Sequence, residues 1–167
     1  MSETTNWMPK TVYVTYIVST PEKVWTALTS GEFTKQYFFG RRVESDWKVG
    51  SKVTYTMEDG TVDIFGKIVR SDHPRLLSFT WNVQWRDEHA KGMGRPLEEL
   101  RRLPETLVTF AIDKLGEVVR LTMTESHQIE LDEKLLEGGR RGWPIILSGL
   151  KSLLETGRAM PPFNPMS

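Results

Sequence analysis

Two residues in the last third of the chain, Glu125 and His127, have the types and the spacing for acid–base chemistry. In a β-strand, residues two apart lie on one face, and the apolar Leu121 would share that face with them. A carboxylate and an imidazole held in an apolar cavity can act as a proton donor and acceptor pair. A second interpretation places both side chains at the cavity rim, where they are solvated or pair with Arg140 or Arg141. The sequence leaves both interpretations open.

Other kinds of catalytic or cofactor site have no signature in the sequence. The chain has no cysteine, so thiolate chemistry and disulfides are excluded. Its three histidines, His73, His89 and His127, fall in different predicted elements, which argues against a metal site. No phosphate loop, dinucleotide fingerprint or nucleophile elbow occurs. We therefore expect no metal and no cofactor, and binding explains the sequence more simply than catalysis does.

Charge and hydropathy exclude two classes of partner. The 22 basic and 22 acidic residues cancel, which gives no electrostatic case for binding nucleic acid. No segment approaches the roughly 18 consecutive apolar residues of a membrane span. Residues 1–10 lack the apolar run of a signal peptide, so we expect a cytoplasmic protein.

Large adaptable side chains are frequent for a chain of 167 residues, with six Trp, seven Phe, four Tyr and seven Met. Such side chains line pockets for apolar ligands, although they also fill ordinary cores. We predict that ten apolar residues line a ligand cavity: Phe38, Tyr55, Met57, Phe79, Trp81, Trp85, Met123, Trp143, Ile146 and Leu150. For each of them, packing between helix and sheet is the alternative interpretation.

The segment from about residue 140 to 156 is predicted to form the main helix. Its bulky apolar residues recur every three or four positions, and Gly157 is suited to end it. The helix could begin anywhere from Leu131 to Arg140, and Pro144 suggests a kink or a start close to that point. Gly149 would allow close approach to a neighbouring element.

Upstream of this helix the period is mostly that of strands. We predict strands at 11–18, around Val43, and at 53–57, 62–68, 77–85, 106–113 and 117–127. Two short helices follow the first strand, the first with Thr20 as N-cap and Pro21 at its first position, the second after Gly31. Residues 86–104 are interpreted as a loop with one short helical turn, either a solvated excursion or a lid.

This order predicts an α+β protein with the helix-grip fold. About six or seven antiparallel strands would form a strongly curved sheet wrapped around the long C-terminal helix. We expect a single domain over residues 1–167, with its core at about 10–158, a flexible N-terminus at 1–9 and a C-terminal tail at 159–167.

Three segments of the sequence also resemble a known family. Residues 20–29 (TPEKVWTALT), after the first strand, are similar to the A-P-x-x-V-W-x-A-L-T signature of the START and polyketide-cyclase superfamily. Residues 74–81 and 142–157 resemble the branch named after the C-terminal domain of the activator of the Hsp90 ATPase. The resemblance covers about residues 10–160 and implies the helix-grip fold, but its motifs contain no catalytic residue to transfer.

Three functions are therefore weighed. The first is binding of a hydrophobic, lipid- or polyketide-like small molecule between the long helix and the sheet. The second, implied by the resemblance, is a protein-interaction module that acts on a chaperone or on a copy of itself. The third is a cyclase-, dehydratase- or hydrolase-type enzyme that uses Glu125 and His127. Both a monomer and a homodimer are compatible with the sequence.

Overall fold

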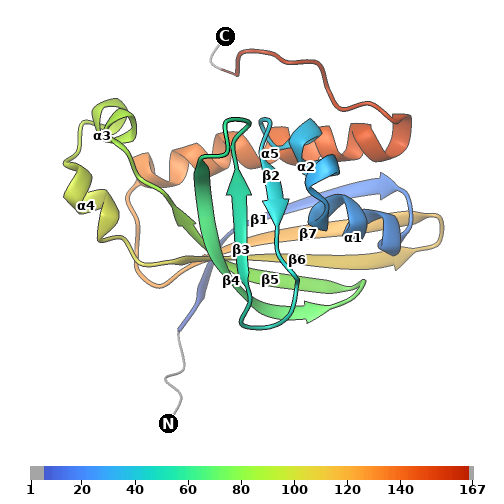
Figure 1. Cartoon of the computed structure of the whole chain (residues 1–167). Coiled ribbons are helices and arrows are strands. Elements are labelled where there is room, and N and C mark those ends of the chain that lie inside the picture. Colours follow the sequence, from blue (N-terminus) through green and yellow to red (C-terminus); the bar gives the residue numbers. More distant parts are fainter. Residues whose placement is uncertain (1–5, 166–167) are drawn as a thin grey trace.

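A curved antiparallel sheet and one long helix laid across it make up most of the molecule (Figure 1). The computed structural model describes residues 6–165. Its elements follow in the order β1 (Met8–Val18), α1 (Pro21–Thr29), α2 (Gly31–Tyr37), β2 (Arg42–Glu44), β3 (Lys52–Thr56), β4 (Val62–Asp72), β5 (Leu76–Val83), α3 (Asp87–Met93), α4 (Leu97–Arg101), β6 (Thr106–Leu115), β7 (Val118–His127) and α5 (Glu133–Thr156).

The seven strands form one sheet in the order β1-β7-β6-β5-β4-β3-β2, and every neighbouring pair is antiparallel. The sheet does not close on itself, because β1 and β2 remain at opposite edges. Helix α5 lies against the concave face, with α1 and α2 beside its C-terminal half and α3 and α4 beside its N-terminal end (Figure 1). The predicted fold class is confirmed. No helix within residues 6–165 is both long and apolar enough to span a membrane.

Both edges of the sheet are partly capped by side chains. At the β1 edge, the backbone N–H of Val18 donates to Glu155 at 2.8 Å, and the Tyr16 carbonyl accepts from Lys151. At the β2 edge, the backbone N–H of Val43 donates to Thr34 Oγ1 at 3.0 Å. These contacts satisfy backbone groups that would otherwise offer a template for pairing with another chain.

The helix α5 begins and ends at residues suited to these positions. The Asp132 carboxylate accepts from the Leu135 backbone N–H at 3.1 Å, which makes Asp132 the N-cap. The helix continues through Pro144 and ends at Gly157, whose φ of 82° is left-handed. Gly149 lies so close to α2 that a Cβ there would be 3.1 Å from Tyr37 Cβ. The predicted close approach at Gly149 is confirmed.

Residues 86–104 differ from the predicted loop. They form α3 and α4, and Leu100 of α4 is 0% exposed. The segment is therefore helical and packed through Leu100, whereas no residue of α3 within Asp87–Met93 is buried. Spacing of three between Leu97, Leu100 and Leu103 gives this charged segment one apolar side, and tertiary packing of that side stabilises helices too short to persist alone.

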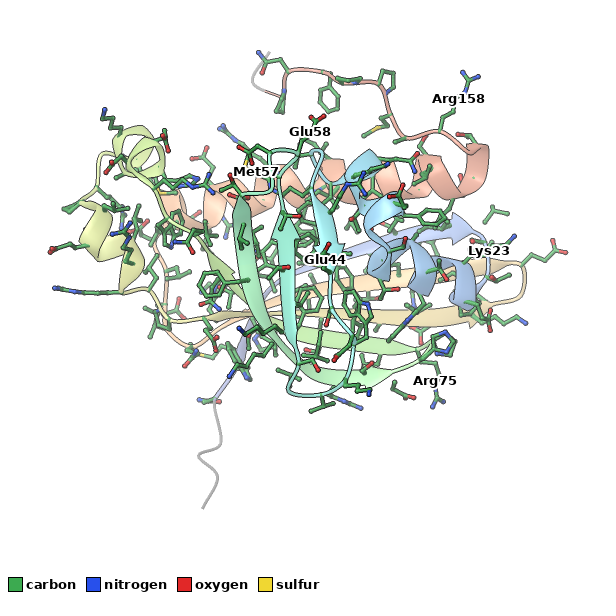
Figure 2. The ribbon with its side chains drawn as sticks, viewed as in Figure 1. Lys23, Glu44, Met57, Glu58, Arg75 and Arg158 are labelled. Carbon is green, nitrogen blue, oxygen red and sulfur yellow. The ribbon has the colours of Figure 1, made fainter. Side chains whose placement is uncertain are left out.

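Two strand predictions also extend too far. The β3–β4 register shifts between Tyr55 and Thr56, so the alternation ends there and Met57 falls in the hairpin turn, 36% exposed. Figure 2 shows Met57 beside Glu58 at this turn. Strand β5 ends at Val83, and Trp85 lies beyond it with its ring edge-on to His89 at 5.4 Å. At the other end of the chain, β1 begins at Met8, inside the segment predicted to be flexible, and residues 1–5 and 166–167 lie outside the described residues.

Candidate functional site

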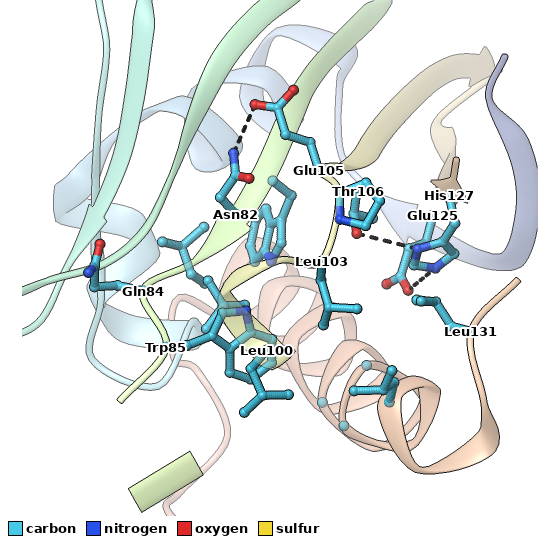
Figure 3. Close-up of a pocket in the computed structure, with 18 of the residues that line it drawn as sticks. Asn82, Gln84, Trp85, Leu100, Leu103, Glu105, Thr106, Glu125, His127 and Leu131 are labelled. Carbon is cyan, nitrogen blue, oxygen red and sulfur yellow. Dashed lines mark hydrogen bonds and ion pairs between the residues drawn. The ribbon is translucent and has the colours of Figure 1, made fainter. Parts of the chain in front are cut away.

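A pocket of about 500 Å³ opens between the N-terminal half of α5, the segment 100–106 and the end of β5. Figure 3 shows this pocket, with the side chains that line it arriving from several elements. Its apolar lining includes Phe38, Phe39, Ile64, Trp81, Trp85, Met93, Leu100, Leu103, Leu131, Leu135, Trp143 and Ile146, and its polar lining includes Arg41, Asn82, Gln84, Arg101, Glu105, Thr106, Glu125, His127 and Gln128.

Aromatic rings form the inner wall of the pocket. The rings of Trp81 and Trp143 are 5.3 Å apart, and Phe38 meets the Trp143 ring edge-on at 5.7 Å. Five of the ten residues predicted to line a cavity do so, namely Phe38, Trp81, Trp85, Trp143 and Ile146.

The other predicted lining residues lie elsewhere. Tyr55, Phe79, Met123 and Leu150 are buried in the core between sheet and helix, where side chains fill the space. The ring of Tyr55 is 4.7 Å from that of Phe38, which separates the core from the pocket. Met57 lies outside the pocket at the β3–β4 turn, where its sulfur accepts from Arg86 Nη1 at 3.8 Å. The pocket lies toward the N-terminal half of α5.

The polar end of the pocket contains the Glu125 and His127 pair. His127 Nε2 lies 2.9 Å from Glu125 Oε1, and the two side chains are 7% and 13% exposed. Trp143 Nε1 donates to Glu125 Oε2 at 3.1 Å. On the other side of the imidazole, His127 Nδ1 lies 3.3 Å from Thr106 Oγ1. Figure 3 shows these three polar residues in a row along the edge of the pocket.

Both arginines considered as partners for Glu125 form ion pairs with other carboxylates. Arg140 forms an ion pair with Glu133, and Arg141 with Glu137, both within α5. Because Glu125 and His127 are mostly buried and contact each other, the interpretation as solvated rim residues is not what the structure shows.

The backbone of α5 approaches Glu125 closely. A Cβ added at Gly139 would lie 3.1 Å from Glu125 Oε2, so a larger residue there would displace the carboxylate. Tyr13 closes the same side, since its hydroxyl donates to the Gly139 carbonyl at 3.4 Å. Burial, followed by the negative charge of Glu125, raises the pKa of Tyr13. The Glu125 carboxylate therefore sits in a narrow space that holds its orientation.

The α3–α4 segment (residues 87–101) covers one side of the pocket. Leu100 and Leu103 contribute apolar surface, and Arg95, between the two helices, is ion-paired with Asp132 at the start of α5. Hydrogen bonding from Arg95, followed by that from the Leu135 backbone, lowers the pKa of Asp132. Sequence reasoning missed Leu100 and Leu103, although their spacing of three was a usable signal. It also missed Thr106, which no local pattern distinguishes from other strand threonines.

The arrangement allows two kinds of chemistry. The aromatic wall can hold a flat apolar molecule, and the Glu125–His127 pair can accept or donate a proton at its polar end. Within the described part of the chain, no three His, Asp or Glu side chains lie close enough to hold a metal ion.

Comparisons with known proteins agree with this fold. The family model described as "Activator of Hsp90 ATPase homolog 1-like protein" matches residues 19–155. No curated protein sequence matches the chain.

Several solved structures share the architecture. A protein from Cytophaga hutchinsonii is 26% identical, with a TM-score of 0.61, covering 88% of this chain and 95% of that one. The Aha1 dimer from Colwellia psychrerythraea is 18% identical, with a TM-score of 0.64 and coverages of 89% and 97%. CalU16 from Micromonospora echinospora is 17% identical, with a TM-score of 0.62 and coverages of 87% and 76%. The last two show similarity of fold alone.

Proposed function

The chain belongs to the family of Activator of Hsp90 ATPase homolog 1-like proteins, and we propose that it binds a hydrophobic small molecule in the pocket beside α5. The observation that carries this proposal is a space of about 500 Å³ walled by Trp81, Trp85 and Trp143. Volumes of roughly 300 to 1,000 Å³ with a mainly apolar lining and a few polar groups are typical of ligand sites. A lipid- or polyketide-like molecule fits this lining.

The pocket can be filled by substitution without disturbing its walls. Gly142 lines the pocket, and a Cβ there would meet no atom within 4 Å. In a Gly142→Leu variant, the added side chain would therefore occupy the ligand space. Ser148 is an exposed residue of the same helix that does not line the pocket, so Ser148→Leu is the matched control.

The experiment has two readouts. Native mass spectrometry of the purified protein reports a co-purified ligand and, at the same time, whether the protein is a monomer or a homodimer. Thermal unfolding with a panel of fatty acids, sterols and aromatic polyketides reports binding as a higher melting temperature, since a ligand that binds only the folded state stabilises it. We expect binding by the parent protein and Ser148→Leu, and none by Gly142→Leu. Absence of any bound ligand and of any shift across the panel would refute the proposal.

A second function, interaction with a chaperone, is supported by the family to which the chain belongs. It predicts that the protein binds an Hsp90 chaperone and raises its ATPase rate. A pull-down without binding, together with an unchanged ATPase rate, would remove this candidate. A cytoplasmic location is proposed with both functions.

A third function, catalysis, is supported by the 2.9 Å contact between Glu125 and His127 inside the pocket. An acid–base pair next to a bound carbonyl compound could promote cyclisation, dehydration or hydrolysis. Unchanged turnover of the bound compound in a Glu125→Gln, His127→Gln double variant would refute it.

A further inference from the structure

The polar end of the pocket is a chain of hydrogen bonds with a fixed direction. Both oxygens of Glu125 are engaged, one by Trp143 Nε1–H at 3.1 Å and the other by His127 Nε2 at 2.9 Å. We assign the hydrogen of the second contact to His127 Nε2, since a carboxylate partner only accepts hydrogen bonds. In a neutral imidazole the opposite nitrogen, Nδ1, is then an acceptor.

The same assignment decides which atom donates between His127 and Thr106. Its hydroxyl lies 3.3 Å from His127 Nδ1, and because Nδ1 accepts, the Thr106 hydroxyl is the donor. With its hydrogen directed at the imidazole, the oxygen of Thr106 presents only lone pairs to other partners. Thr106 lines the pocket, so beside His127 the polar end offers a ligand a hydrogen-bond acceptor rather than a donor.

The charges around the pocket disfavour an anion at this end. Glu105 and Glu125 both line it. Of the lining cations, Arg41 is bound to Asp63 at 2.6 Å, and Arg101 is an exposed residue of α4. A carboxylate placed against His127 would face the like charge of Glu125, which is unfavourable in a partly buried site.

We propose that the pocket selects a neutral aromatic molecule with a hydroxyl group, the ring lying against Trp81 and Trp143 and the hydroxyl hydrogen donated to Thr106 Oγ1. This inference rests on the proposed function and specifies its ligand class. Glu125 acts as a positioning residue, since its contact with His127 sets the direction of the hydrogen bond to Thr106.

Three probes of one shape test the donor preference: naphthol, methylnaphthalene and methoxynaphthalene, each substituted at the same ring position. Naphthol can donate a hydrogen bond, methoxynaphthalene can only accept one, and methylnaphthalene can do neither. Binding is followed by NMR titration of the Trp143 indole N–H at one constant pH. We expect naphthol to bind roughly three- to tenfold more tightly than methylnaphthalene, the effect of one net hydrogen bond.

A Glu125→Gln variant should reverse the direction of the chain. Trp143 Nε1–H still requires the amide oxygen, so the amide NH₂ faces His127 Nε2 and makes that nitrogen the acceptor. His127 Nδ1–H then donates to Thr106, whose hydroxyl hydrogen is free to point into the pocket. We expect the affinity for methoxynaphthalene relative to methylnaphthalene to rise roughly threefold. Glu105→Gln makes the same chemical change at a lining residue that is not part of the hydrogen-bond series Trp143–Glu125–His127–Thr106, and it should leave this affinity ratio unchanged.

The outcomes separate the two proposals. If methylnaphthalene binds the parent protein as tightly as naphthol, the hydroxyl preference is wrong while ligand binding stands. If Glu125→Gln leaves both the melting temperature and the ratio of methoxynaphthalene to methylnaphthalene affinity unchanged, the proposed direction of the hydrogen bonds is wrong. If no probe shifts the Trp143 resonance, the pocket does not bind flat aromatic molecules and the proposed function loses its main support.

Discussion

The hydrogen bond between Trp143 and Glu125 allows a quantitative test of how the site is held. The Trp143 ring is 5% exposed and contacts the rings of Phe38, Trp81 and Phe110, so Trp143→Ala should cost about 3 to 5 kcal/mol of unfolding free energy. That number mixes ring packing with the hydrogen bond. Trp143→Phe separates them, because it keeps an aromatic ring and removes the donor.

The magnitude for Trp143→Phe follows from the charge of its partner. A hydrogen bond to an ionised group contributes roughly 1.5 to 3 kcal/mol, and Glu125 is too buried for water to replace the lost donor fully. We therefore expect a loss of about 2 to 3 kcal/mol, with a small part of it from the smaller ring.

A double-mutant cycle isolates the pair. The parent protein, Trp143→Phe, Glu125→Met and the double variant are unfolded in urea, and their unfolding free energies are compared. Because Glu125→Met leaves His127 without its acceptor in both the single and the double variant, that effect cancels. We expect a coupling of about 1 to 2 kcal/mol. A coupling below about 0.5 kcal/mol would refute the view that Trp143 orients Glu125.

Three further predictions concern the frame around the site. Gly149→Ala should destabilise the protein by about 1 kcal/mol, because the added Cβ would lie 3.1 Å from Tyr37 Cβ. Gly142→Ala should stabilise it by about 0.5 to 1 kcal/mol, because a Cβ there meets no atom within 4 Å. Equal changes of the unfolding free energy in urea for the two variants would contradict this prediction. Leu100→Ala should lower the unfolding free energy by about 2 to 3 kcal/mol and speed amide hydrogen exchange in the α3–α4 segment. Leu103→Ala, at a less buried position, should lower the unfolding free energy less. Identical exchange rates in the parent protein and in Leu100→Ala would argue that α4 does not pack on the pocket. Burial raises the pKa of Tyr37, so the unfolded state loses this proton first as pH rises above about 10, and the unfolding free energy should fall there. In Tyr37→Phe this fall should be smaller. An equal fall of the unfolding free energy in the parent protein and in Tyr37→Phe would refute the raised pKa of Tyr37.

The architecture could be predicted from patterns that extend over many residues of the sequence. Alternation over many residues located the strands, and the three-and-four spacing with Gly157 located α5, because these periods report which face is buried. The predicted end of the third strand was wrong, because the alternation breaks there without any residue typical of a turn or bulge. The bulge after Tyr55 moves Met57 out of register, and bulges depend on the partner strand rather than on local composition.

The candidate site was predictable only in part. Period-two spacing brought Glu125 and His127 together correctly, since strand geometry fixes that relation. It could not distinguish Phe79, which packs in the core, from Trp81, which reaches the pocket from the same strand face. That difference depends on how far α5 stands from the sheet at each point, and therefore on tertiary packing. The pairing of His127 with Thr106 depends on β6–β7 register, which the sequence alone leaves open.

The shared position of Asp132 makes two contacts of the structure depend on one carboxylate. This one carboxylate both caps α5 through the Leu135 N–H and holds Arg95 of the α3–α4 segment. Since its pKa is lowered in the folded protein, the stabilisation is present above the unfolded-state pKa and is lost as pH falls through the folded-state value. Protonation of Asp132 would thus loosen the start of the helix and the cover of the pocket together.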